Sequence, residues 1–287
     1  MTSLSLITLN KTGLESIVNT FKVAVLISGR GSNLQALIDA CKNPSFPAEI
    51  AVVVSNVPTA RGLAIAADAG IPAMIVDHTY FKGDKPAFEN ALASICEQHG
   101  ADLVALAGFM RVLGPVFLNR FKDKVINIHP SLLPAHKGLN VHEAVLAAGD
   151  KMSGCSVHVV TAGVDEGQVI AQREIKVKRD DTPQTLASRV LSEEHILYPE
   201  VIKKIAQGDV VIRDGGIETK GAIRHHRGLK NHSPETPMAH DHPTTASVAD
   251  PEAIKRSQDM WHNFVVASTF AGGAIVVTLV LMAVFLV

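Results

Sequence analysis

The feature that most constrains the fold is a rhythm that begins at Lys22. Short runs rich in β-branched residues alternate there with longer amphipathic runs. The short runs read KVAVLI, EIAVVVS, AMIVD, DLVALAG and KVINI. Such alternation is typical of parallel strands joined by crossover helices, and nearly continuous apolar strands indicate a sheet covered on both faces. The sequence therefore predicts an α/β domain with an open, mostly parallel, doubly wound sheet.

The pattern changes in the second half of this region. After His142 a short helix leads to CSVHVVT and VIAQREIKV, which are separated by the turn-like AGVDEG and predict a hairpin or adjoining strands. A long helix is expected from about Thr182 to Ala206, with Pro183 in its first turn. Pro199 falls inside this helix and should kink or divide it.

The last parallel run closes in NIHPSLLP, from Asn127 to Pro134. Asn127 and His129 share a β-period with Val125, so both side chains should face one side at the carboxyl end of a strand, where open α/β sheets place ligand sites. Pro130 then ends regular structure. Taken alone, this pattern fits a strand end with a hydrogen-bonded, partly buried histidine better than a catalytic site.

The turn after the first strand predicts an anion site. It reads SGRGSN and brings together Gly29, Gly31, Ser32 and Asn33. Glycines let the backbone approach a ligand, and a helix amino terminus offers unpaired N–H groups to a phosphate. A dinucleotide site is the alternative, but the third glycine is missing and Ser55 and Asn56 stand where an acidic ribose partner is wanted. A phosphomonoester therefore fits this turn better than a dinucleotide does. A plain tight turn that binds no ligand is the other alternative.

Two further loops carry candidate residues. After the fourth strand, AGFMRVLG suits a flat heteroaromatic ligand through Met110, Arg111, Val112 and Leu113, although core packing explains it equally well. Asp165 lies in a glycine-flanked turn, after a strand that carries Ser156 and His158. A carboxylate near His129 would raise the pKa of that imidazole and orient it, but an isolated turn aspartate is more often solvated.

Composition excludes several classes of protein. The net charge is -1 and no basic cluster is interleaved with aromatics, so nucleic acid is not an expected partner. The three cysteines, Cys41, Cys96 and Cys155, form no Cys-x-x-Cys pair, which argues against a disulfide framework or a zinc site. The catalytic part is expected in a reducing cytoplasm, without a metal.

In combination, the motifs resemble a known family. VLISGRGSNLQALIDAC, LAGFMRVL, NIHPSLLP, GCSVHVV, GVDEGQVI and EEHILYPEVI are similar, in order and spacing, to the phosphoribosylglycinamide formyltransferases. The resemblance covers about Lys22 to Gly216. It implies a formyltransferase-type fold and transfer of a formyl group from 10-formyltetrahydrofolate to the amino group of glycinamide ribonucleotide, in purine biosynthesis.

The resemblance also implies a role for each motif. Asn127, His129 and Asp165 match the catalytic trio, with Ser156 and His158 supporting them. The substrate phosphate and ribose would be held by Gly31, Ser32, Asn33 and Glu194. The folate pocket would be formed by Met110, Arg111, Val112, Leu113, Thr161, Ala162, Gly163 and Val164.

The implied mechanism needs neither a metal nor a covalent enzyme intermediate: Asn127 and protonated His129 stabilise an oxyanion, while Asp165 keeps His129 charged. One departure is Asn140, where the family commonly has histidine. Formyltetrahydrofolate deformylase and methionyl-tRNA formyltransferase share the Asn, His, Asp logic and are the alternatives. The phosphate-loop Ser32 and Asn33 favour the nucleotide substrate.

The remaining chain predicts three further segments. Residues 1–21 form an amino-terminal extension without the pattern of a signal peptide, and residues 217–259 form a polar, histidine-rich flexible linker. Residues 260–287 include an uncharged run from Phe264 to Val287, which as a helix would span roughly 36 Å and cross a membrane. Lys255 and Arg256 predict a cytoplasmic amino side, so the enzyme would be tethered to a bacterial inner membrane.

Residues 238–287 resemble the small single-helix subunit IV of bacterial cytochrome c oxidase, which implies oxidase subunits as partners. A generic membrane anchor and a buried core helix are the alternatives. The chain is either a genuine fusion or two neighbouring genes that have been joined, and the sequence does not decide between them.

Overall fold

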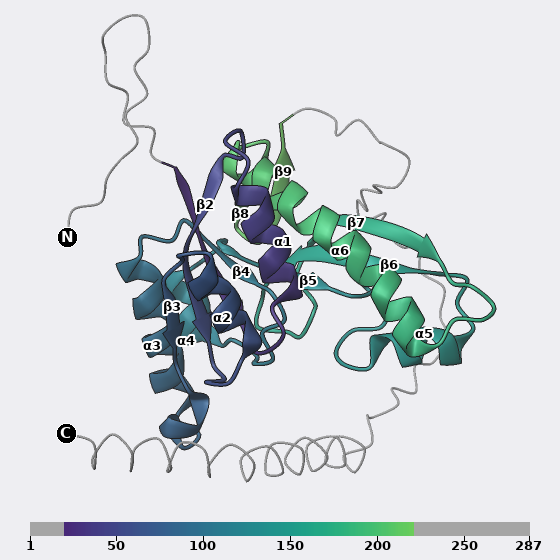
Figure 1. Ribbon diagram of the computed structural model, residues 1–287, viewed down its shortest axis with the longest axis horizontal. Helices are drawn as coiled ribbons and strands as arrows, with labels where there is room; N and C mark the ends of the chain where they lie inside the picture. The colour runs from purple at the N-terminus through teal and green to yellow at the C-terminus, as the bar shows by residue number, and fades with distance from the viewer. Residues whose placement is uncertain (1–19, 221–287) are drawn as a thin grey trace, which may run out of the picture. The chain divides into compact units, whose positions relative to one another are not determined.

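The computed structural model describes residues 20–220. Within them lies a seven-stranded sheet in the order β3-β2-β1-β4-β5-β6-β7 (Figure 1). Its strands are β1 (Phe21–Ile27), β2 (Ala48–Ser55), β3 (Ala73–Ile75), β4 (Leu103–Leu106), β5 (Val125–His129), β6 (Met152–Val159) and β7 (Val169–Lys176). Neighbouring strands from β3 to β5 pair in parallel, and β6 and β7 pair antiparallel. The predicted mostly parallel α/β sheet and the predicted hairpin are confirmed.

Helices cover both faces of the sheet and enclose two cores. The helices are α1 (Ser32–Cys41), α2 (Arg61–Asp68), α3 (Lys85–Gln98), α4 (Pro115–Arg120), α5 (Val141–Ala148) and α6 (Pro183–Ala206), with a short 3₁₀ turn η1 (His78–Phe81). Alternate strand residues divide between the cores: Val23 and Val25 pack with α1 and α6, whereas Ala24 and Leu26 pack with α3 and α4. Figure 1 shows α1 and α6 side by side on one face.

The long helix α6 begins where the sequence predicts. Thr182 and Thr185 form a reciprocal capping box, and Pro183 occupies the first turn, where a missing N–H costs nothing. Of the two outcomes expected at Pro199, division of the helix is wrong, because one continuous helix runs past it to Ala206, and a kink stays a prediction. Buried contacts of Leu197, Tyr198 and Val201 on either side of the proline hold the helix against the sheet.

A second, two-stranded sheet closes the described region. It consists of β8 (Val210–Arg213) and β9 (Gly216–Thr219), which form an antiparallel hairpin. Asp214 and Gly215 both have positive φ, as a tight two-residue hairpin turn requires, and their N–H groups donate to the Asp123 carboxylate at 2.8 and 2.9 Å. Strand β9 therefore continues three residues past the boundary predicted at Gly216.

The other predicted segments lie largely or wholly outside the described residues: the extension 1–21, the linker 217–259 and the helix 260–287. Within residues 20–220, no helix is both long and apolar enough to cross a membrane.

Candidate active site

A stripe of polar side chains crosses β5, β6 and β7. Asn127 pairs with His158 and His129 with Ser156 across β5 and β6, and Ser156 pairs with Gln172 across β6 and β7. Residues directly opposite one another in a sheet share a face, so these five side chains lie in line. The residues between them are apolar and pack into the core that α6 covers. The two-residue period of the strands therefore places the polar side chains on one face and these apolar core residues on the other.

The predicted catalytic trio meets in this stripe. Asp165 Oδ2 lies 3.3 Å from His129 Nδ1, and Asp165 Oδ1 lies 3.4 Å from His158 Nε2. Asn127 Nδ2 donates to His158 Nε2 at 3.1 Å. Asp165 has a φ of 52°, which turns its carboxylate back between the two imidazoles, and Gly138 N–H donates to that carboxylate at 2.9 Å. His158, predicted as a supporting residue, thus links Asn127 to the pair of Asp165 and His129.

Two backbone carbonyls determine which ring nitrogens of His129 and His158 carry hydrogen. His129 Nε2 is 2.9 Å from the carbonyl oxygen of His136, and His158 Nδ1 is 2.9 Å from that of Val159. A carbonyl only accepts, so both ring nitrogens carry hydrogen. His158 then accepts from Asn127 through its other nitrogen. Both nitrogens of His129 face acceptors, a geometry that suits the imidazolium form.

Burial and hydrogen bonding act against each other on these groups. Burial lowers the pKa of His129, and the His136 carbonyl and Asp165 only partly offset it. The predicted rise is therefore wrong in its net direction, because the loss of hydration outweighs the carboxylate. Burial also disfavours ionisation of Asp165, but its contact with His158, the hydrogen bond from Gly138 N–H and the charge of His129 lower its pKa overall. Asp165 is ionised at neutral pH.

Ser156 and Gln172 hold the loop that follows β5. Ser156 Oγ donates to Ser131 O at 2.6 Å, and it accepts from Leu133 N–H at 3.0 Å and from Gln172 Nε2 at 2.8 Å. Gln172 also donates to Leu133 O at 2.9 Å. Ser156 is fully buried, so its support for the site is to anchor this loop.

The predicted phosphate loop is built on two glycines in contact. Gly31 has a φ of 79°, and a Cβ there would come within 2.7 Å of Gly62 Cα at the start of α2. Gly62 N–H donates to Gly29 O at 3.1 Å. Gly31 caps α1 without a side chain, so the first N–H groups of the helix, including those of Ser32 and Asn33, have no side-chain partner at the cap. This end of α1 is suited to an anion.

Asn33 connects this loop to α6. Its amide donates to Glu194 Oε2 at 2.6 Å, and its own Oδ1 is buried without a partner. Burial raises the pKa of Glu194, against the hydrogen bond from Asn33 and the charge of Arg30. One helical turn further on, the buried Tyr198 hydroxyl lies 3.0 Å from Leu106 O and 3.3 Å from Ile126 O. The helix is thus bonded to the end of β4 and to the start of β5.

Exposed apolar side chains lie in the loops around the trio. Met110 and Val112 in the loop after β4, Leu139 after the β5 loop and Val164 beside Asp165 are each roughly half or more exposed. Arg111 and Ala162 are also exposed, and Thr161 and Gly163 are half-buried. Large apolar groups left in water mark a binding surface. Unlike its neighbours, Leu113 has a side chain that is buried in the core with Phe117, so only its backbone is available to a ligand at this surface.

Three residues at the site escaped sequence reasoning. Glu89, buried on α3, accepts from Gly114 N–H at 2.6 Å and Phe117 N–H at 3.2 Å, which fixes the end of the Met110 loop. An acid on the apolar face of an amphipathic helix is the signal that marks it. His136 and Asp150 form a 2.6 Å pair beside His129, and no spacing rule predicts it.

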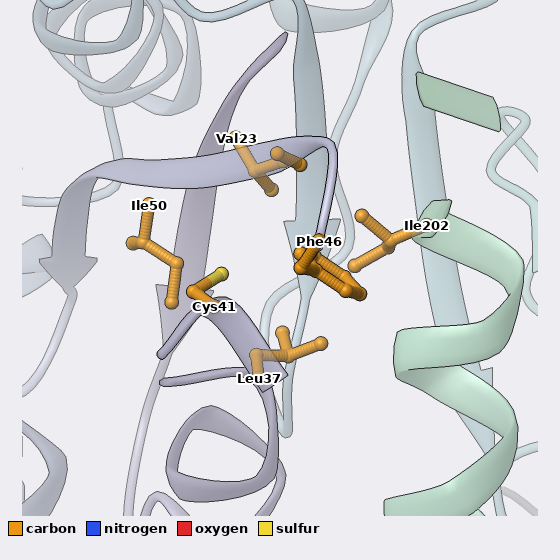
Figure 2. Close-up of a pocket in the computed structure, with 7 residues that line it drawn as sticks. Val23, Leu37, Cys41, Phe46, Ile50 and Ile202 are labelled. Atoms are coloured by element: carbon orange, nitrogen blue, oxygen red, sulfur yellow. The ribbon is translucent and has the colours of Figure 1, made fainter. Parts of the chain in front are cut away.

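A small apolar cavity lies away from this chemistry. Its volume is about 10 Å³, and Figure 2 shows the side chains that surround it: Val23, Leu37, Cys41, Phe46, Ile50 and Ile202. Val23 and Ile50 sit near the amino ends of β1 and β2, opposite to the edge that carries Asn127. Among residues 20–220 there is also no group of three or more His, Cys, Asp or Glu side chains placed to hold a metal ion.

The fold and site correspond to a known class of enzyme. The sequence profile of the formyl transferase family matches residues 21–202, which include Asn127, His129 and Asp165. This match defines the class as a formyl transferase domain.

Similarity to individual proteins identifies the family within this class. The chain is 39% identical over 193 residues to the phosphoribosylglycinamide formyltransferase of Haemophilus influenzae, covering 67% of this chain and 91% of that protein. The crystal structure of glycinamide ribonucleotide transformylase 1 from Symbiobacterium toebii superposes with a TM-score of 0.67 at 43% identity, covering 70% of this chain and 94% of that one. The chain belongs to the phosphoribosylglycinamide formyltransferase family.

Larger relatives contain a similar region. The chain is 47% identical over 195 residues to the trifunctional purine biosynthetic protein adenosine-3 of Bos taurus, covering 68% of this chain but 19% of that protein. It spans about a fifth of the length of that trifunctional relative.

Proposed function

We propose that this chain transfers the formyl group of 10-formyltetrahydrofolate to the amino group of glycinamide ribonucleotide, in purine biosynthesis. The observation that carries the proposal is the meeting of Asn127, His129 and Asp165. On one side lies the unpaired start of α1, suited to the phosphate of the ribonucleotide. The exposed apolar loops suit the folate, and family membership supports both assignments.

The geometry suggests how the trio acts. The substrate amine attacks the formyl carbon, a new C–N bond forms, and the bond from the formyl carbon to the folate nitrogen breaks. Asn127 uses one amide hydrogen on His158, which leaves the second for the developing oxyanion. The pair formed by Asp165 and His129 takes up the proton that leaves the amine and returns one to the departing folate nitrogen.

Glu194 and Asn33 are proposed to hold the ribonucleotide. Their hydrogen bond places a carboxyl and a free amide oxygen beside the amino end of α1, where ribose hydroxyls adjoining the phosphate would lie. The proposed folate surface keeps Met110, Arg111, Val112 and the turn from Thr161 to Val164. Leu113 contributes through its backbone only.

A direct comparison of acceptors tests the function. Purified full-length protein is given 10-formyltetrahydrofolate with glycinamide ribonucleotide or with water alone as acceptor. We expect formylated ribonucleotide and negligible formate, because the anion site holds the amine at the formyl carbon. Formate release at the same rate in both arms would favour the deformylase alternative. Asp165→Asn should abolish either activity, whereas Asp214→Asn, which removes an exposed carboxylate paired with Lys122, should not.

We also propose, from sequence alone, that residues 260–287 attach the enzyme to a membrane, because the run from Phe264 to Val287 holds no charge. The resemblance to an oxidase subunit stays a prediction. Cell fractionation with an antibody against the catalytic domain tests the attachment. A soluble, active enzyme that ends near Lys230 would exclude it.

A further inference from the structure

A second histidine and aspartate lie directly behind the catalytic histidine. His136 is in the loop between β5 and α5, and its Nε2 is 2.6 Å from Asp150 Oδ2, just beyond the end of α5. The carbonyl of the same His136 accepts the hydrogen bond from His129 Nε2 at 2.9 Å. Asp150 therefore reaches the catalytic imidazole through one residue, from the side opposite to Asp165.

The loop is anchored on both sides of His136, and the contact with Asp150 holds the side chain of His136 itself. Ser131 Oγ donates to Ala135 O at 2.6 Å, and Gly138 N–H donates to Asp165, so the backbone is fixed on both sides of His136. His136 itself has a φ of 52°, a conformation that is unfavourable for most non-glycine residues. The short hydrogen bond between its imidazole and the Asp150 carboxylate favours this conformation.

We propose that Asp150 and His136 are positioning residues for His129, with the Asp150 carboxylate holding the His136 carbonyl against the imidazole Nε2. The catalytic consequence rests on the proposed function, whereas the effect on His129 itself does not. The contact keeps the imidazole in the plane that points its Nδ1 at Asp165. The His136 carbonyl also accepts the hydrogen on His129 Nε2, which would otherwise be buried without an acceptor.

The pair should also influence the protonation of His129. The groups around that imidazole are Asp165, His158, His142 and the His136 carbonyl, and Asp150 faces His136. The carbonyl is an acceptor that favours the protonated ring, so its loss lowers the pKa of His129 further. A merely structural role would change stability without moving this pKa.

Three variants test the proposal in the full-length protein: Asp150→Asn, His136→Asn and the double variant. Asparagine tolerates positive φ, so His136→Asn removes the imidazole without forcing the backbone to change. We expect each single variant to lower kcat roughly tenfold, because each removes one charge-assisted hydrogen bond. The KM values for both substrates should change little. The double variant should be no worse than either single one, because all three remove the same contact. Asp214→Asn, which removes an exposed carboxylate outside the site, is the control variant.

A second readout does not depend on activity. The pKa of His129 is followed by NMR on histidine-labelled protein, with its signal assigned by loss in His129→Gln. We expect it to fall in Asp150→Asn and to stay unchanged in Asp214→Asn. Variants with wild-type kcat and a wild-type His129 pKa would overturn the proposal. If wild-type protein formylates no ribonucleotide but the pKa still shifts, the proposed function fails and the positioning role stands.

Discussion

The two halves of the sheet contribute to the site in different ways. From β3 to β4 the strands are parallel, and their carboxyl ends lead into loops and helix starts that offer backbone N–H groups, as at Gly31. From β5 to β7 the pairing reverses, and three strands present side chains in a line. The groups proposed to act at the reacting centre, Asn127 and His129, both come from this second half.

This difference has a physical origin. A parallel strand must cross over through a helix, so its end naturally supplies an unpaired helix terminus, which suits an anion of fixed charge. An antiparallel ladder sets residues directly opposite each other, so polar side chains on adjacent strands come within hydrogen-bonding reach, as Asn127 and His158 do. One half is suited to binding and the other to proton chemistry, so changes in the two halves should separate KM from kcat.

The largest effect is expected in the antiparallel half. Asn127→Ala removes the proposed oxyanion donor and should lower kcat about 100- to 1000-fold, with KM values within a few-fold of wild type. Steady-state kinetics with both substrates measures this split. Asn119→Ala, on the exposed face of α4, is the control and should leave kcat intact. A loss expressed mainly in KM would contradict the division between the halves.

In the parallel half, Gly31→Ala should act on binding. The new Cβ meets Gly62 Cα at 2.7 Å and forces a positive φ on alanine, so the α1 terminus must shift. We expect KM for the ribonucleotide to rise roughly tenfold with a smaller change in kcat, and stability to fall by about 1–3 kcal/mol. Gly70→Ala shares the positive φ but meets nothing within 4 Å, so it isolates the cost of φ alone. Equal effects in both variants would show that contact with Gly62 is unimportant.

Glu89→Gln probes the loop after β4. A neutral amide oxygen replaces a carboxylate that accepts from both Gly114 and Phe117, so one buried N–H loses its partner. We expect a stability loss of about 1–3 kcal/mol and a several-fold rise in KM for the folate, without a matching loss in kcat. Chemical denaturation and folate titration measure the two effects. Unchanged folate KM would mean that the loop is held by other contacts.

The smallest effect concerns pH. Burial lowers the pKa of His195 on α6, and its Nε2 lacks a partner. A folded pKa below the unfolded value means that the unfolded chain binds more protons, so this contribution to stability is lost as pH falls below about 6.5. His195→Gln should therefore make the free energy of unfolding fall less between pH 7.5 and 5.5. Denaturant melts at the two pH values test this, and parallel losses in both proteins would contradict it.

The sequence specified the order of elements and much of the site. The β-period alone placed Asn127 and His129 on one face, because alternation is intrinsic to a strand. The contact with Asp165 was predicted through the family resemblance, since the turn that folds it back depends on a positive φ that no pattern encodes. His136 and Asp150 are 14 residues apart across a loop and a helix, beyond any local spacing rule.

Two differences show where local patterns fail. Leu113 ends an apolar run that resembles a pocket wall, but the chain turns there into α4 and its side chain joins Phe117 in the core. The pKa of His129 follows burial more than its nearby carboxylate, and burial is a property of the assembled fold. Exposure and hydration are set by tertiary packing, so a single sequence does not report them.

Tyr198 has a consequence for substrate choice. Its hydroxyl bonds Leu106 O and Ile126 O, next to Asn127, and Glu194 stands one helical turn away on the same helix. The separation between the proposed sugar-binding acid and the reacting centre is therefore fixed from inside the protein, before any ligand arrives. An acceptor whose amine lies one bond closer to or further from its ribose would then fit only in a strained conformation, because the distance between the two sites in the protein is set by this contact. Under the proposed function, Tyr198 would thus help to select the length of the substrate without touching it.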